Sequence, residues 1–86
     1  MKNKIALGSI AMDLKRVALG YHRGSYSMAE KFLDEALKRR REVDSSLLKP
    51  YLVKLLKDID KIKKEKKKDK AAEDALLYST LFQNAI

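Results

Sequence analysis

The residues best suited to chemistry gather in one short segment, GYHRGSYS, at residues 20–27. It holds the only histidine of the chain, His22, between Tyr21 and Arg23, a combination that could bind phosphate or transfer a proton. No second histidine, cysteine or carboxylate pair accompanies it, and its two glycines form neither a GxGxxG motif nor a phosphate-binding loop. We therefore predict that the segment is a corner between helices, and we expect no catalytic residue in the chain.

Two basic runs are the strongest polar features, KRRR at residues 38–41 and KKEKKKDK at residues 63–70. Lysine and arginine can neutralise phosphates, so the possible polyanion contacts are Lys38, Arg39, Arg40, Arg41, Lys63, Lys64, Lys66, Lys67 and Lys68. Consecutive residues on a helix point around its whole circumference, and no aromatic residue interrupts either run to stack on bases. Any binding of nucleic acid is therefore predicted to be weak, electrostatic and independent of sequence.

The composition supports a basic partner-binding protein more than an enzyme. The chain has 86 residues and a net charge of +8, from 20 Lys and Arg against 12 Asp and Glu. Such a balance favours polyanions, anionic membranes or acidic proteins. Cysteine is absent, which excludes disulfides and thiolate metal sites and suits a cytoplasmic protein. We expect no metal and no cofactor, and the abundance of Lys and Glu leans towards a thermophile.

The N-terminus combines two lysines with an apolar run at residues 5–12, which faintly suggests a signal peptide. The run is short and Asp13 closes it, so we interpret it as the start of an amphipathic helix. No stretch approaches the roughly 18 apolar residues of a membrane span, and we expect no membrane partner.

The helix that carries His22 must bend or end near it. Glycine and proline are rare in the chain, helix-forming residues dominate, and the predicted fold class is all-α. A capping-box sequence at residues 27–30 could start a new helix. The spacing of seven between Leu14, Tyr21 and Met28 would equally line one unbroken helix. Break and kink both remain open, and the spacing slightly favours a kink between Gly20 and Gly24.

Apolar residues recur at helical spacing in every segment. The first segment, residues 5–21, has an apolar stripe consisting of Ile5, Leu7, Ile10, Leu14, Val17, Ala18 and Tyr21. The second, to residue 43, places Met28, Phe32, Leu33, Ala36 and Leu37 inside. Beyond Asp44, helices are predicted at residues 47–66, with Pro50 in the first turn, and at residues 70–86, where Asp69 could act as the cap. Their stripes are Leu48, Leu52, Leu55, Ile59 and Ile62, and then Ala71, Ala75, Tyr78, Phe82 and Ala85.

These helices predict one domain over residues 1–86, an antiparallel up-and-down three-helix bundle whose first helix, residues 5–43, is long or kinked. Four helices are the alternative. In the three-helix version residues 27–86 form the core and residues 1–26 form an arm with an uncovered stripe. Such a patch usually marks a contact surface, so we predict a homodimer through Ile5, Ile10, Leu14 and Val17. The arm could instead fold back at residues 20–24 as a fourth helix.

From about Ser27 to Ile86 the chain resembles an archaeal family of small three-helix proteins, domain of unknown function 357. The resemblance rests on a capped helix, the DSS turn, a Leu-rich helix ending in KKDK, and the last helix, AAEDALLYSTLFQNAI. Tyr78, Phe82, Asn84 and Ala85 fall at the family's Tyr, aromatic, Asp/Asn and Ala positions. The second helix departs from it, with Lys in place of frequent Ala and aromatic residues. The resemblance implies an antiparallel helical bundle and an archaeal source, and no activity, cofactor or partner.

For function, the first hypothesis is a small non-enzymatic interaction or scaffold module. The alternative is a basic nucleic-acid-associated protein that binds phosphates electrostatically. An enzyme ranks last, because no nucleophile–base pair, metal cluster or phosphate loop is present in the sequence.

Overall fold

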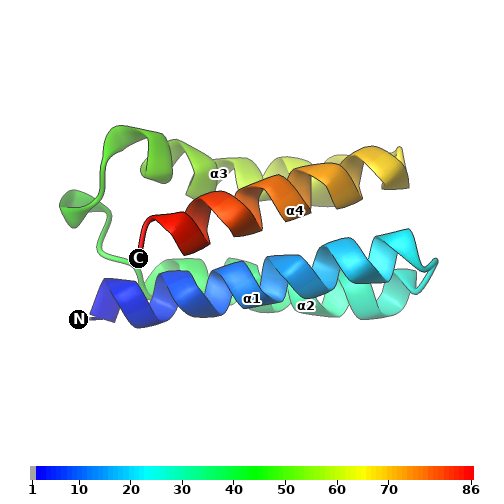
Figure 1. The fold of residues 1–86 in the computed structure, drawn as a ribbon, viewed down its shortest axis with the longest axis horizontal. Coiled ribbons are helices and arrows are strands. Elements are labelled where there is room, and N and C mark those ends of the chain that lie inside the picture. The colour runs from blue at the N-terminus through cyan, green and yellow to red at the C-terminus, as the bar shows by residue number, and fades with distance from the viewer. Residues whose placement is uncertain (1) are drawn as a thin grey trace.

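In the computed structural model, which describes residues 2–86, the protein is a bundle of four α-helices (Figure 1). The elements are α1 (Lys2–His22), α2 (Tyr26–Arg39), η1 (Arg40–Glu42), η2 (Ser45–Leu47), α3 (Pro50–Lys64) and α4 (Lys68–Asn84). The all-α class is confirmed. The α1–α2 and α3–α4 turns lie at one end of the bundle, on the right in Figure 1, and both termini lie at the other.

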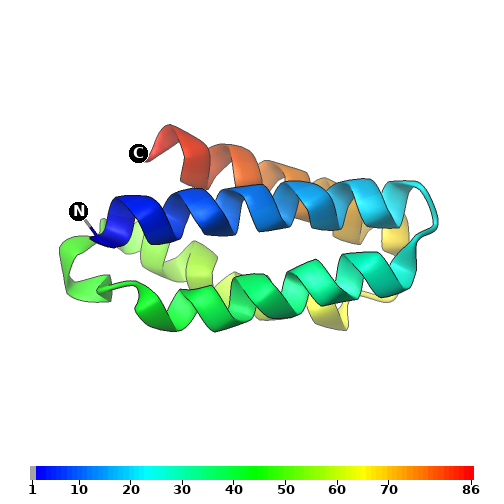
Figure 2. The same ribbon diagram turned by 90° about the horizontal axis from the view of Figure 1, so that it is seen from below.

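The four helices run alternately up and down around one core. Helix α1 packs against α2 and α4, and α3 packs against the same two helices, so α1 and α3 are diagonally opposed (Figures 1 and 2). The bundle is 36 Å long and 19 by 18 Å across, about one helix length by two helix diameters.

Helix α1 ends at the corner and does not kink through it. The Ser25 amide donates to the Gly20 carbonyl at 2.8 Å, and the Gly24 amide donates to the Tyr21 carbonyl at 3.3 Å. This pair of hydrogen bonds is a Schellman motif, which requires a left-handed residue after the helix, and Gly24 supplies it with φ +79°. The predicted kink was wrong, because Gly24 reverses the chain completely.

Folding back covers the α1 stripe within one chain. Ile10, Leu14 and Val17 are 0% exposed and belong to a core to which all four helices contribute. The three-helix version, with a separate arm at residues 1–26, was therefore wrong, and the four-helix alternative holds. These three residues no longer support a prediction of self-association, because other helices of the same chain already cover their side chains. Ile5 alone of that set is exposed, at 73%.

Small residues let α1 and α4 approach closely. Ala71 and Ala75 of α4 are fully buried, and one turn further on the Ser79 hydroxyl donates to the Ala11 carbonyl of α1 at 2.6 Å. A larger side chain at any of these positions would separate the two helices. Phe82, also fully buried, fills the space near the end of α4.

The remaining helix ends differ in part from those predicted. Pro50 opens α3 as expected. Helix α2 begins at Tyr26 after Ser25, with no capping side chain, so the capping box predicted to start at Ser27 does not form. Helix α4 begins at Lys68, two residues earlier than predicted, and Asp69 lies in its first turn without capping it. Asp44 caps η2 by accepting from the Ser46 amide at 3.1 Å.

Asn3 holds the connection between α2 and α3, a role that the sequence did not reveal. Its side-chain amide donates to the Asp44 carbonyl at 3.0 Å and accepts from the Asp44 amide at 2.8 Å. Asn3 is buried, and a buried amide with both functions used fixes a loop firmly. The long connection is thereby tied to the start of α1.

Candidate interaction surfaces

The corner segment divides its polar residues between solvent and the core. His22, the last residue of α1, and Arg23, which follows it, are exposed, whereas Tyr21 is buried and its ring lies 5.9 Å from that of Tyr26. Lys68 places its ammonium 5.2 Å from the Tyr21 ring centre and 6.0 Å from that of Tyr26. This cation–π arrangement joins the two turns at this end of the bundle, so Lys68 serves the fold.

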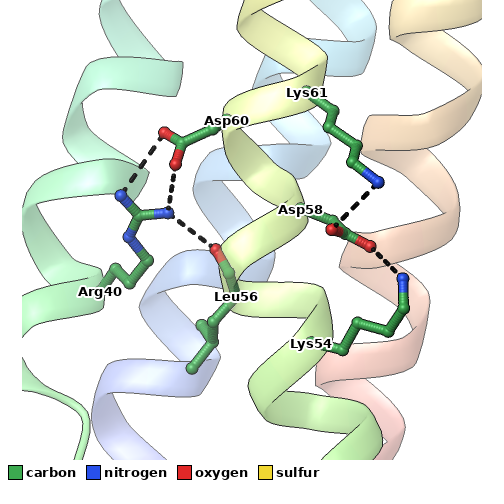
Figure 3. Close-up of polar contacts among 6 residues, drawn as sticks. All are labelled: Arg40, Lys54, Leu56, Asp58, Asp60 and Lys61. Carbon is green, nitrogen blue, oxygen red and sulfur yellow. Dashed lines mark hydrogen bonds and ion pairs between the residues drawn. The ribbon is translucent and has the colours of Figure 1, made fainter.

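Most residues of the first basic run form ion pairs with carboxylates of the same chain. Arg40 lies beside Asp60 of α3, at 3.2 and 3.5 Å, and donates to the Leu56 carbonyl at 2.9 Å (Figure 3). Arg39 lies 3.4 Å from Asp13 of α1. Lys38 makes a loose pair with Glu35 at 3.9 Å. Arg40 thus connects η1 to α3, Arg39 connects α2 to α1, and Arg41 is exposed.

Asp13 is a charge partly removed from water at the α1–α2 contact. Burial raises the pKa of Asp13 above its ordinary value of 3.8, although Arg39 and Arg16 favour the charged form. Within residues 2–86 its Oδ2 atom and the Nε atom of Arg39 find no hydrogen-bond partner. The pair is therefore close without being well aligned, and a hollow beside it is lined by Ser9 and Met12 among others.

The lysines of the second basic run fall into two groups: one pairs with a carboxylate of another helix, and others form no ion pair among residues 2–86. Lys63 reaches across to Asp34 of α2 at 3.0 Å. Lys64, Lys66 and Lys67 are exposed and form no ion pair with any residue that the structure describes. The structure therefore does not bring the two predicted runs together as one surface.

A third basic feature lies on α3 and was missed. Lys54, Lys57, Lys61 and Lys64, here called the α3 lysine row, are all exposed and are spaced by three, four and three residues. That spacing puts them on one face, opposite the buried Leu52, Leu56 and Ile59. This spacing of lysines could have been seen in the sequence, because it lies on the helix face opposite the apolar stripe.

Asp58 lies beside this row and is held by two of its lysines. Lys54 approaches one carboxylate oxygen at 3.1 Å and Lys61 the other at 3.4 Å (Figure 3). The hydrogen bond from Lys54, followed by the charge of Lys54 and the contacts with Lys61, lowers the pKa of Asp58 below 3.8. A carboxyl group with a lowered pKa stabilises the folded state above its unfolded pKa and loses that contribution as the pH falls through its folded pKa.

We expect the Asp58→Asn variant to lose less stability than the parent between about pH 5 and pH 2, because this contribution is missing from it. Urea unfolding at a series of pH values measures how steeply the free energy of unfolding changes with pH. Asp13→Asn is the contrasting variant. Its raised pKa makes protonation favour the folded state, so its removal should steepen the acid decline. Equal slopes in all three proteins would contradict the assigned directions.

The outer side of α1 and α4 carries five of the large apolar residues that are exposed. Ile5, Met12 and Leu19 follow one another at intervals of seven along α1, and Leu76 and Ile86 lie on the neighbouring C-terminal segment. We call these five residues the α1–α4 face. Leu19 and Leu76 flank an open groove whose floor includes Ala18 and Ala72. Ile5, Met12 and Ile86 line a second hollow towards the termini.

The rims of the groove carry opposite charge. On the α1 side they are Lys15 and His22, and on the α4 side Asp69 and Glu73. The four residues are exposed, and the structure shows no ion pair for them within residues 2–86. The groove therefore has an apolar floor between a basic and an acidic edge.

No protein-family profile, characterised protein or solved structure matches this chain significantly. The resemblance to domain of unknown function 357 thus stays a prediction. Of residues 2–86, none of the helices is both long and apolar enough to cross a membrane. Within the same residues, no three histidine or acidic side chains are placed to share a metal ion. The expectations of no metal, no cofactor and no enzymatic activity also stay predictions.

Proposed function

We propose that this chain is a small non-enzymatic scaffold module that pairs with a second copy of itself through the α1–α4 face. The observation that carries the proposal is the set of exposed apolar residues that recur every seven positions along α1. They lie beside an apolar groove with rims of opposite charge. Seven-residue spacing is what a helix presents when a second helix packs along it. The contact differs from the one predicted from sequence, since only Ile5 belongs to both.

The carboxylates support a non-enzymatic role, because the structure uses many of them in ion pairs. Asp13, Asp34, Asp58, Asp60 and Asp74 each lie within 4 Å of a lysine or arginine side chain. Asp13, Asp34 and Asp60 pair with residues of another element, and Asp58 and Asp74 pair within their own helices, which is the pattern of structural ion pairs. The one histidine is exposed at a helix end.

The charges of the groove favour a second copy as the occupant. A twofold axis parallel to the bundle would place α1 of each copy over α4 of the other. Lys15 would then face the acidic Glu73 of the second copy, and His22 would face its Asp69. An isologous contact of this kind is self-complementary, as closed dimers require. Opposite charges at the edge would fix the register, while the apolar residues exclude water.

Sedimentation equilibrium at tens of micromolar tests the pairing. We expect the intact chain to be a dimer, and Leu19→Glu with Leu76→Glu to be a monomer, since each glutamate would leave a charge in the dry contact. Leu47→Glu with Tyr51→Glu is the matched control, because these residues are equally exposed but lie elsewhere. A monomeric parent chain, or equal dissociation of the control, would refute this interface.

A charge exchange tests the register. Lys15→Glu alone should weaken dimerisation several-fold, because it places two acidic groups together. Adding Glu73→Lys should restore it by recreating the pair with the signs reversed. If the double variant stays as weak as the single one, the twofold arrangement is wrong even if a dimer exists.

A further inference from the structure

The α3 lysine row is a rigid line of positive charge on the side of α3 that faces away from the core. At 1.5 Å per residue its four lysines extend over about 15 Å. Helix α3 is anchored on the other side by Leu52, Leu56 and Ile59, all of them buried. The row therefore has a fixed spacing before any ligand arrives, which reduces the entropic cost of binding.

Nearby acidic groups do little to cancel this line. Asp60 is neutralised from outside the row by Arg40, which belongs to η1, directly after α2 (Figure 3). Asp58 is shared between Lys54 and Lys61, and leaves Lys57 and Lys64 without an ion pair among the described residues. Beyond Lys64, the turn adds Lys66 and Lys67, which are exposed. Arg40, which the sequence assigned to direct polyanion contact, would thus act indirectly, by neutralising the opposing charge of Asp60.

We propose that the α3 lysine row binds the phosphate backbone of a duplex nucleic acid, with Lys57 and Lys64 as its main contacts. A duplex presents one phosphate per strand for about every 3.4 Å of its axis. Because each strand winds around that axis, a straight row of about 15 Å can follow one strand over only two or three phosphates, which suits two main contacts. Lys66 and Lys67 continue the same contact past the end of the helix. This binding is separate from pairing through the α1–α4 face, because α3 lies diagonally opposite α1.

The surroundings of the row favour a duplex over the other anionic partners. Stacking on single-stranded bases needs aromatic side chains, and the residues from 54 to 67 include none. Insertion into a membrane surface needs apolar side chains beside the lysines, but the exposed residues of this stretch are lysines. What remains is contact with phosphates alone, which carries no base specificity.

Fluorescence anisotropy with a labelled 20-base-pair duplex, as DNA and as RNA, tests the proposal. At 50 mM salt, counterion release makes each phosphate contact worth about tenfold in affinity. Replacing Lys57 and Lys64 by Gln should therefore weaken binding about a hundredfold and reduce the log–log salt slope by about two. The control is Lys4→Gln with Lys31→Gln, two exposed lysines of α1 and α2. It removes the same charge and should change affinity only a few-fold.

Three results would overturn the proposal: no binding to either duplex at 50 mM salt, equal losses in the two variants, or binding only to vesicles of phosphatidylserine and phosphatidylcholine. Equal losses would mean that net charge acts without a site. Arg40→Gln adds an independent readout, since it frees Asp60 and should weaken duplex binding although Arg40 need not touch phosphate. Salt separates this activity from pairing, because duplex binding should fall steeply with salt, whereas the mainly apolar α1–α4 contact should change much less.

Discussion

Leu14→Glu is expected to leave the chain unfolded at room temperature. Leu14 is fully buried in α1, and removing a leucine side chain from such a site costs about 3–5 kcal/mol. Burying a carboxylate there without a partner adds several kcal/mol more. A domain of this size has a stability of about 4–13 kcal/mol. The combined cost approaches or exceeds that total.

Circular dichroism at 222 nm and a thermal melt measure the outcome. Met12→Glu is the control, because Met12 lies half a turn away on the same helix and is 47% exposed. Measured at low micromolar concentration, it should change stability by about 0.5 kcal/mol or less. A cooperative melt for Leu14→Glu would show that α1 does not fold back. If that variant were also a monomer beside a dimeric parent, self-association through the Leu14 stripe would be correct after all.

The second large effect is a difference in sign between two glycine substitutions on α1. A Cβ added at Gly20 would lie 2.8 Å from the Ala29 Cβ and 3.0 Å from its Cα and N atoms. Backbone atoms cannot move aside, so α1 and α2 would have to separate near the turn. Such overpacking costs about 1–3 kcal/mol. At Gly8 an added Cβ meets only the Ile86 Cδ1 atom, at an ordinary 3.4 Å.

Both substitutions improve helix propensity by about 1 kcal/mol. Gly8→Ala should therefore stabilise the protein, whereas Gly20→Ala should destabilise it, and chemical denaturation should separate the two by about 1–3 kcal/mol. Gly24→Ala provides a third comparison. Nothing lies within 4 Å of its added Cβ, yet its φ of +79° makes a loss of about 1 kcal/mol expected. Stabilisation by Gly20→Ala would contradict the close α1–α2 approach.

The apolar periodicity of the sequence predicted which side of α1, α3 and α4 is buried, because the spacing of apolar residues within one helix identifies its buried face. It could not predict what covers that face. The stripe around Leu14 was assigned to a second chain, whereas α4 and α2 cover it. The seven-residue spacing that ends at Met28 suggested a continuous helix, but Met28 is 38% exposed and belongs to a different helix.

The candidate sites were predicted less well, for a related reason. Whether an arginine is available to a ligand depends on which carboxylate the fold places beside it. Arg39 and Asp13 are 26 positions apart in the chain, as the numbering shows, and no local pattern joins them. The α3 lysine row, by contrast, follows from spacing within one helix. It was overlooked because consecutive basic residues are more conspicuous, although they distribute their charge around the helix axis.

The close pairing of α1 with α4, sealed by the Ser79–Ala11 hydrogen bond, has a consequence for biosynthesis. The ribosome delivers α1 long before α4, so during translation the apolar side of α1 can be covered only by α2. Helix α4 begins 46 positions after the end of α1 (68 − 22), and it can cover α1 only once residues 68–84 have left the exit tunnel. Contacts between the earliest and latest helices raise the contact order and slow folding. The nascent chain should therefore remain open to proteases and chaperones until its final helix emerges, and then close in one cooperative step.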